Sequence, residues 1–212
     1  RRGGYGAGGV SVKHRLGFRR AASRVPPMKH LPNAITVLRA ALIPLQAWLL
    51  LERDYATAFL LFVASGLSDL ADGWIARRFD LRTRFGAIAD PAADKLTMLT
   101  VAVLLAMHDW LPWWFTALVV GRDLVIVSGA AAYHFTIGEV EMAPSWISKL
   151  NTALEFVFLA FVLALAAGYL DDGPWYPALL YATAATIVAS GASYVLVWSR
   201  KAVEARRAAT RS

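Results

Sequence analysis

The sequence predicts an all-α integral membrane protein with six transmembrane helices, a basic amphipathic N-terminal segment and both termini in the cytoplasm. Of its 212 residues, 58% are hydrophobic and 17% are charged. The apolar residues fall in long runs, and most charged residues lie between these runs. Soluble domains are nearer half apolar and about a quarter charged, so a lipid bilayer is the solvent that suits this chain. The absence of cysteine excludes disulfides and cysteine-ligated metals.

Six apolar runs are long enough to cross a bilayer as helices. The connectors between them are short, so consecutive helices are expected to run antiparallel. The expected helices are Ala34–Leu51, Ala56–Arg77, Ala87–His108, Pro112–His134, Ile147–Leu170 and Pro177–Trp198.

The charges between the runs predict the side on which each connector lies. Residues 1–30 hold eight Lys and Arg and no acid, residues 77–84 hold four arginines, and five more basic residues follow from Arg200 onward. The opposite ends are rich in acids, at 52–54, 108–109 and 171–172. Because Lys and Arg accumulate in cytoplasmic loops, we expect both termini and the arginine-rich connector inside. Tryptophan and tyrosine beside the acidic connectors are typical of an outer aromatic belt.

The chain divides into three segments by composition. We expect a basic flexible or interfacial segment over 1–30, a six-helix domain over 31–199 and a basic cytoplasmic tail over 200–212. The first segment has the composition of a cytosolic stretch lying on lipid headgroups, with a mitochondrial targeting peptide as the alternative. The net charge of +7 suits anionic lipids, and the basic segment lacks the interleaved aromatics of a nucleic-acid binder.

Four carboxylates lie at the cytoplasmic ends of the second and third expected helices. Asp69 and Asp72 share one stripe of the second helix, and Asp90 and Asp94 are one turn apart on the third. Ionisable groups inside a span are costly and usually mark function. Four clustered carboxylates cannot all remain ionised without cations between them, and all-oxygen ligands favour hard divalent cations. The pattern therefore predicts a metal site suited to phosphoryl chemistry, with a buried salt-bridge network as the alternative.

Small residues and one arginine accompany these acids at fixed spacings. The pattern reads Asp69-x2-Asp72-Gly73-x2-Ala76-Arg77-x8-Gly86-x3-Asp90-x3-Asp94. This pattern resembles the signature of the CDP-alcohol phosphatidyltransferase family, and the six-helix plan resembles the family over residues 31–198.

The resemblance implies a reaction in which an alcohol attacks a CDP-linked lipid and CMP leaves. Asp69, Asp72 and Asp90 would hold two divalent cations, Mg²⁺ or Mn²⁺, and Asp94 would be the general base and a further metal contact. Gly73, Ala76 and Gly86 would let the cytidine and its phosphates approach the backbone, and Arg77 would hold the diphosphate. Family members are typically homodimers, so a homodimer is expected here.

Two flanking segments extend the resemblance. Asn33 and Thr36, with Arg39, open the first helix like the family's nucleotide-contacting entry, although Asn33 would serve equally as an N-cap. Ser148 and Lys149 open the fifth helix, where many relatives have glycine before the lysine. Arg39, Lys149 and Arg122 are candidate acceptor-binding residues, while Arg122 with Asp123 is equally expected as an intramembrane ion pair.

The identity of the acceptor depends on few residues. The run Ile147–Thr152 and the Gly121-Arg122-Asp123 triplet are similar to eukaryotic-type cardiolipin synthases, which join CDP-diacylglycerol to phosphatidylglycerol. The alternative is phosphatidylglycerophosphate synthase, whose acceptor is glycerol 3-phosphate. A cation transporter, from another class, would need acids across the whole membrane, and here they stop at its cytoplasmic third. The expected location is a bacterial inner membrane with the active site facing the cytoplasm, or the mitochondrial inner membrane.

Overall fold

The computed structural model describes residues 31–79, 84–136 and 146–209, with side chains over 41–70, 93–129, 131 and 146–200. These residues are entirely helical. The elements are α1 (Leu31–Leu51), α2 (Tyr55–Phe79), α3 (Arg84–Met107), α4 (Trp113–Thr136), α5 (Trp146–Ala166) and α6 (Trp175–Ala209). Each expected helix overlaps one of them, so the all-α class and the number of helices among the described residues are confirmed.

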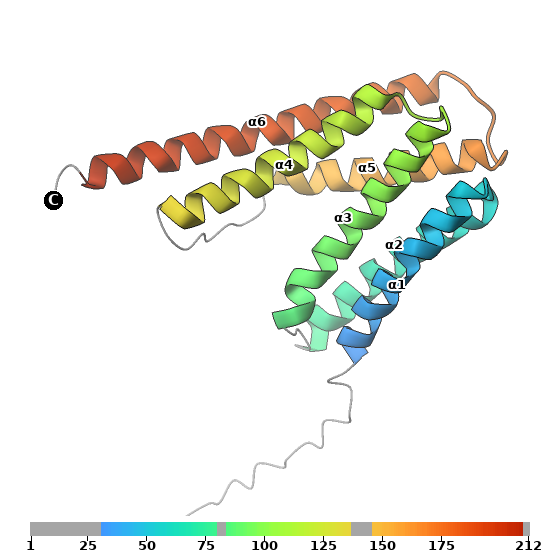
Figure 1. Ribbon diagram of the computed structural model, residues 1–212, viewed down its shortest axis with the longest axis horizontal. Coiled ribbons are helices and arrows are strands. Elements are labelled where there is room, and N and C mark those ends of the chain that lie inside the picture. The colour runs from blue at the N-terminus through green and yellow to red at the C-terminus, as the bar shows by residue number, and fades with distance from the viewer. Residues whose placement is uncertain (1–30, 80–83, 137–145, 210–212) are drawn as a thin grey trace, which may run out of the picture.

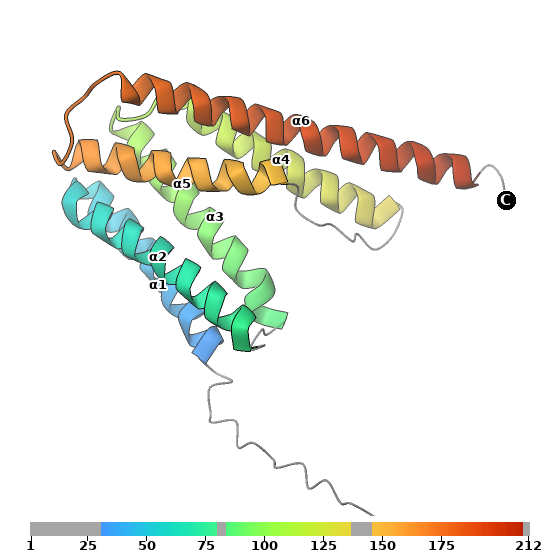
Figure 2. The same ribbon diagram turned by 180° about the vertical axis from the view of Figure 1, so that it is seen from behind.

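The helices are gathered at one end and spread apart at the other (Figures 1 and 2). The α1–α2, α3–α4 and α5–α6 connectors meet at the gathered end. Tyr55 donates or accepts a 3.2 Å hydrogen bond with Nδ1 of His108, and the Tyr176 hydroxyl donates to the Trp110 carbonyl at 2.8 Å. The three acidic connectors that the sequence assigns to one side of the membrane therefore lie together.

Three helices at the gathered end finish in the same hydrogen-bonded turn. After α5, the Tyr169 amide donates to the Ala164 carbonyl and the Gly168 amide to the Leu165 carbonyl, with Gly168 at φ 73°. This is a Schellman ending, which needs a left-handed residue just past the helix. Arg53 after α1 and Asp109 after α3 take the same place with positive φ, although side chains disfavour it. The expected fifth helix reached Leu170, and this turn ends it four residues earlier.

Asp54 closes the first turn of α2 from outside the helix. Its Oδ1 accepts a 3.1 Å hydrogen bond from the Thr57 amide, which satisfies one of the helix's free donors. Hydrogen bonds from the side chain and then from the amide of Thr57 lower the pKa of Asp54 below its usual value. Because the pKa of Asp54 is lower in the folded state, its ionised carboxylate stabilises the fold at pH values above the ordinary pKa of 3.8. This contribution is lost as the pH falls through the pKa of the folded state.

The core lies where the helices converge. Phe62 of α2, Phe115 of α4 and Phe158 of α5 are almost completely buried, and the rings of Phe115 and Phe158 meet edge-on at 5.1 Å. Gln46 of α1 is also buried and donates to the Ala58 carbonyl of α2 at 3.1 Å. A hydrogen bond within a folded protein contributes roughly 0.5 to 1.5 kcal/mol net, so this one adds modestly to the packing of α1 against α2.

The outward faces of the helices are apolar. Leu60, Leu67, Leu124, Val127 and Val157 are each more than half exposed, whereas soluble monomers rarely show large continuous apolar surfaces. Among the described residues, two stretches are long and apolar enough to cross a membrane, Trp146–Ala166 and Trp175–Arg200. Shorter apolar stretches occupy Ala41–Leu51 and Tyr55–Leu70. This pattern is consistent with a membrane protein.

Helix α6 is longer than the expected sixth span. It continues to Ala209, so most of the basic segment that the sequence separates as a tail from residue 200 is a continuation of this helix. The helix projects beyond its neighbours toward the C-terminus (Figure 1).

Candidate active site

A cavity of about 620 Å³ lies between α2, α3 and α5. Each of the three helices contributes one charged residue to its wall: Asp69 from α2, Asp94 from α3 and Lys149 from α5. The remaining lining residues are Phe62, Ser65, Gly66, Leu70, Thr97, Met98, Ser148, Thr152, Ala153, Phe156 and Val157. Two consecutive helices and a third that is distant in sequence therefore build one site.

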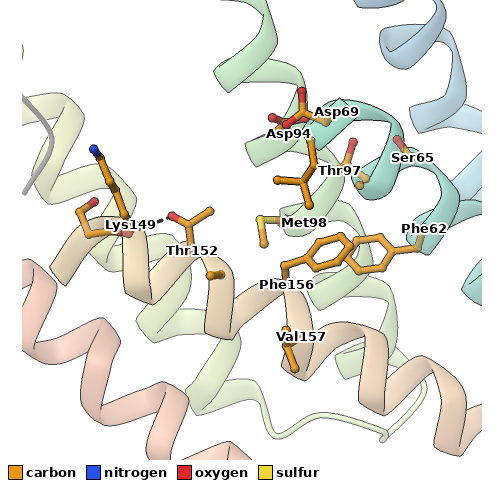
Figure 3. A pocket seen from close by; sticks show the side chains of 14 residues that line it. Phe62, Ser65, Asp69, Asp94, Thr97, Met98, Lys149, Thr152, Phe156 and Val157 are labelled. Carbon is orange, nitrogen blue, oxygen red and sulfur yellow. Dashed lines mark hydrogen bonds between the residues drawn. The ribbon is translucent and has the colours of Figure 1, made fainter. Parts of the chain in front are cut away.

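The two described carboxylates of the sequence motif both line this cavity. Figure 3 shows Asp69 and Asp94 toward the same end, with the aromatic residues of the wall farther along. Both side chains are partly buried. Ser65 precedes Asp69 by one helical turn and Thr97 follows Asp94 by three residues, which places each hydroxyl on the same helix face as its carboxylate.

Most other predicted site residues lie on α1, α2 and α3, but their side chains are outside the described part of the chain. They are Asp72, Gly73, Ala76 and Arg77 on α2, Gly86 and Asp90 on α3, and Asn33, Thr36 and Arg39 on α1. The helical backbone of α2 and α3 keeps the spacing on which the motif depends. Among described side chains alone, no group of three or more His, Asp or Glu is placed to hold a metal ion, and two of the four predicted ligands are not in that set.

One wall of the cavity is made by an aromatic pair. The rings of Phe62 and Phe156 stack with centroids 4.7 Å apart and an angle of 19° between their planes. A Cβ atom at Gly66 would lie 2.3 Å from Cζ of Phe156, closer than any real contact. The absence of a side chain at Gly66 is therefore what lets the Phe156 ring lie flat between α2 and α5.

Lys149 and Arg122 are placed differently. Lys149 is exposed and lines the cavity. Arg122 of α4 is buried, with only 6% of its surface exposed, and it does not line the cavity directly. Its Nη2 donates to Oγ of Ser148 at 2.7 Å and to Oγ of Ser190 at 3.1 Å, so it contacts the cavity wall through Ser148.

The ion pair that the sequence left as one option for Arg122 is present. Nη1 of Arg122 lies 2.7 Å from Oδ1 of Asp123, and Lys95 of α3 also forms an ion pair with that oxygen. Nε of Arg122 is buried without a hydrogen-bond partner among the described residues. The guanidinium thus joins α4 to α5 and α6 in the interior of the bundle.

A second set of buried polar residues was missed by the sequence analysis. Asn151 and Glu155 of α5 are both buried, and Nδ2 of Asn151 lies 3.4 Å from Oε2 of Glu155. The Thr186 hydroxyl of α6 donates to Oδ1 of Asn151 at 3.0 Å. Ser148, Asn151 and Glu155 recur at helical spacing in an apolar run, and that polar stripe is the signal that could have identified them.

Most of the chain is similar to known proteins. Residues 29–203 match the family described as CDP-alcohol phosphatidyltransferase. A cardiolipin synthase (CMP-forming) / mitochondrial hydrolase fusion protein from Schizosaccharomyces pombe is 33% identical over 181 residues, which are 78% of this chain and 30% of that protein. The cardiolipin synthase (CMP-forming) of Homo sapiens is 30% identical over 190 residues, 82% of this chain and 63% of the relative.

A relative with a different name matches to a similar degree. The chloroplastic CDP-diacylglycerol–glycerol-3-phosphate 3-phosphatidyltransferase 1 of Oryza sativa subsp. japonica is 30% identical over 183 residues, 78% of this chain and 56% of the relative. In each case the matched region spans less than two thirds of the curated relative's length.

Proposed function

Because the chain belongs to the CDP-alcohol phosphatidyltransferase family, we propose that it transfers a phosphatidyl group from CDP-diacylglycerol to phosphatidylglycerol, giving cardiolipin and CMP. The observation that carries this proposal is the cavity, in which Asp69 and Asp94 share one space with an apolar wall. A polar reaction centre continuous with apolar side chains suits two lipid substrates. The relatives named cardiolipin synthase support the same acceptor.

The chemistry is a substitution at phosphorus. The free hydroxyl of phosphatidylglycerol attacks the lipid-side phosphorus of CDP-diacylglycerol, and the bond from that phosphorus to the bridging oxygen breaks to release CMP. We assign Asp94 as the base that takes the hydroxyl proton, which is the role that the resemblance to the family's motif implies for it. Its carboxylate lines the cavity, and an ionised carboxylate can accept a proton there. Asp69 lines the same cavity from α2.

The donor set fits divalent cations. Asp69 and Asp94 bring two carboxylates to one cavity from two helices, and repulsion between such groups is relieved by a cation. We assign Asp69, Asp72, Asp90 and Asp94 as the residues that would hold two ions, Mg²⁺ or Mn²⁺. When bound, these ions neutralise phosphate charge and make the phosphorus easier to attack.

The remaining motif residues would bind the two substrates. Gly73, Ala76 and Gly86 would allow close approach of the nucleotide, and Arg77, Asn33 and Thr36 would contact its polar groups. For the acceptor we assign Arg39, Lys149 and Arg122. Lys149 lines the cavity, which suits contact with a phosphodiester, whereas Arg122 would act through Ser148.

The apolar outer surface supports a membrane-embedded arrangement. We propose that α1 to α6 all cross the bilayer, that the gathered end of the bundle faces outward, and that both termini and the cavity's carboxylates face the cytoplasm. On this arrangement residues 1–30 lie on anionic headgroups. We further propose a homodimer in a bacterial inner membrane, with the mitochondrial inner membrane as the alternative.

The acceptor is tested by CMP release from CDP-diacylglycerol and Mg²⁺, using purified protein in phospholipid nanodiscs. We expect release with phosphatidylglycerol and none with glycerol 3-phosphate. Release only with glycerol 3-phosphate would instead make the chain a phosphatidylglycerophosphate synthase, the second candidate, which the relative from rice favours. Release with neither acceptor would contradict both assignments.

Replacing Gly66 with alanine is expected to lower kcat/KM about tenfold by disturbing the cavity wall. The new methyl group would occupy the place of the Phe156 ring. The ring lines the cavity, so its displacement would change the shape of the cavity wall. The double substitution Gly66→Ala/Phe156→Leu should recover most of the loss, because leucine is shorter. Gly121→Ala is the matched control, since a Cβ atom there meets nothing within 4 Å. An equal loss in the single and double variants would contradict this reading.

A further inference from the structure

Five residues form a continuous polar network across four helices. The network consists of Lys95 of α3, Arg122 and Asp123 of α4, Ser148 of α5 and Ser190 of α6. The Asp123 carboxylate accepts from both Lys95 and Arg122. Arg122 then donates to the two serine hydroxyls. Asp123 therefore forms ion pairs with both cations of the network.

Lys95 follows Asp94 directly on α3. Successive residues of an α-helix are turned by about 100° around its axis, so a fixed direction for Lys95 also fixes the direction of Asp94. The ion pair draws Lys95 toward α4, while Asp94 lines the cavity between α2, α3 and α5. Rotation of α3 that broke the pair would also turn Asp94 relative to the cavity.

The ion pair joins α3 and α4 at some distance from the turn that connects them. Helices α3 and α4 diverge from their shared turn at 108–112 (Figures 1 and 2). Near that turn, the Thr116 hydroxyl donates to the Ala102 carbonyl at 3.4 Å. Lys95 and Asp123 connect the helices farther along, where they have separated. A charge-assisted contact there restrains both the angle between the helices and the rotation of α3.

The other end of the network reaches the α5 wall of the same cavity. Ser148 lines the cavity and accepts the hydrogen bond from Arg122. Lys149 comes next on α5, and Thr152 lies one turn later on the cavity side. The Arg122–Ser148 contact therefore restrains the rotation of α5, as the Lys95–Asp123 contact does for α3.

We propose that Asp123 is a positioning residue: by holding Lys95 toward α4 and Arg122 against Ser148, it fixes the rotations of α3 and α5 that bring Asp94 and Lys149 to one cavity. Asp123 does not line that cavity, so it acts through its two partners. The catalytic consequence rests on the proposed phosphatidyl transfer, whereas the structural consequence does not.

The activity test uses Asp123→Asn in the full chain in phospholipid nanodiscs. We expect kcat for CMP release to fall about 10- to 100-fold, with the KM for CDP-diacylglycerol little changed, because misplacement of a reacting group affects mainly the chemical step. Asp123→Glu should restore most of kcat, since it keeps the carboxylate. Asp171→Asn is the matched control, because it makes the same chemical change at an exposed connector residue. Activity of Asp123→Asn equal to that of this control would overturn the proposal.

The structural test measures the distance between α3 and α5 directly. The natural chain has no cysteine, so nitroxide labels attach only at introduced sites. Leu96→Cys on α3 and Leu150→Cys on α5 are suitable, because both positions are exposed and neither lines the cavity. Pulsed electron–electron double resonance should give a narrow distance distribution between the two labels in the parent and in Asp123→Glu. In Asp123→Asn the distribution should be broader or shifted.

The activity test and the distance test separate the proposed phosphatidyl transfer from the proposed positioning role of Asp123. If the parent releases no CMP with either acceptor, the proposed function fails, and the distance measurement still decides whether Asp123 positions the helices. If Asp123→Asn does not fold, Lys95→Met replaces it in both arms, because it keeps the Arg122–Asp123 pair and removes only the link to α3. An unchanged distance distribution in the folded variant would overturn the positioning role.

Discussion

Asp94→Asn is expected to lower kcat for CMP release by about 1,000-fold, within the range that general bases contribute. Asparagine keeps the shape of the side chain, but its amide does not accept the proton of the attacking hydroxyl. Asp94 lines the cavity from α3, so the change should act on the chemistry and leave the helix packing intact. The measurement is CMP release from CDP-diacylglycerol with phosphatidylglycerol and Mg²⁺, together with thermal unfolding of the same sample.

Asp172→Asn is the control for this substitution. Asp172 is exposed in the connector between α5 and α6, at the gathered end of the bundle, so the same carboxylate-to-amide change there should leave kcat unaltered. Full activity of Asp94→Asn would show that another group takes the proton.

The helices were largely predictable because long apolar runs determine them. Every expected span overlaps an observed helix, and the differences occur at helix ends. The end of α5 carried a usable signal, since Gly168 is the residue type that most often adopts the left-handed turn observed there. The same turn after α1 and α3 uses Arg53 and Asp109. Those residue types adopt it only when the surrounding structure requires it, so sequence could not locate them.

For the candidate site, local spacing predicted that carboxylates of two neighbouring helices would converge. Asp69 and Asp94 share a cavity, as expected from a motif whose two halves flank a short connector. The α5 wall was only partly predictable. Lys149 was identified from its position at a helix start, whereas the fit of Phe156 against Gly66 depends on which helices are neighbours. The packing of α2 against α5 is a property of the three-dimensional fold, and the sequence pattern within either helix does not predict it.

Arg122 shows the same limit for a charged residue. The sequence left open whether it pairs with Asp123 or binds the acceptor. The structure contains the ion pair and adds hydrogen bonds to two serines that lie 26 and 68 residues away in sequence. Those distant partners explain how a guanidinium is accommodated at 6% exposure, since buried charges require paired or hydrogen-bonded surroundings. Because the sequence does not show that these two serines lie beside Arg122, burial of this side chain could not be inferred from it.

Chelation of divalent cations with EDTA is expected to lower CMP release by about 1,000-fold or more, because bound metals contribute several kcal/mol to phosphoryl transfer. Mg²⁺ or Mn²⁺ should restore activity after removal of the chelator. The carboxylates provide only oxygen ligands, which favour such hard cations. Activity that is unchanged by thorough chelation would contradict the assignment of the four aspartates as metal ligands.

Asp69→Asn tests whether this metal requirement belongs to the cavity. The substitution keeps the size of the side chain but removes one negative charge from the α2 wall. The Mg²⁺ concentration for half-maximal activity should rise at least about 10- to 100-fold, since the loss of outer-shell partners alone costs that much affinity at metal sites. Ser68→Ala is the neighbouring control, because Ser68 is exposed and does not line the cavity. A loss of kcat at saturating Mg²⁺ with no change in the Mg²⁺ requirement would contradict the assignment of Asp69 as a metal ligand, because removal of a ligand should lower the affinity for the metal.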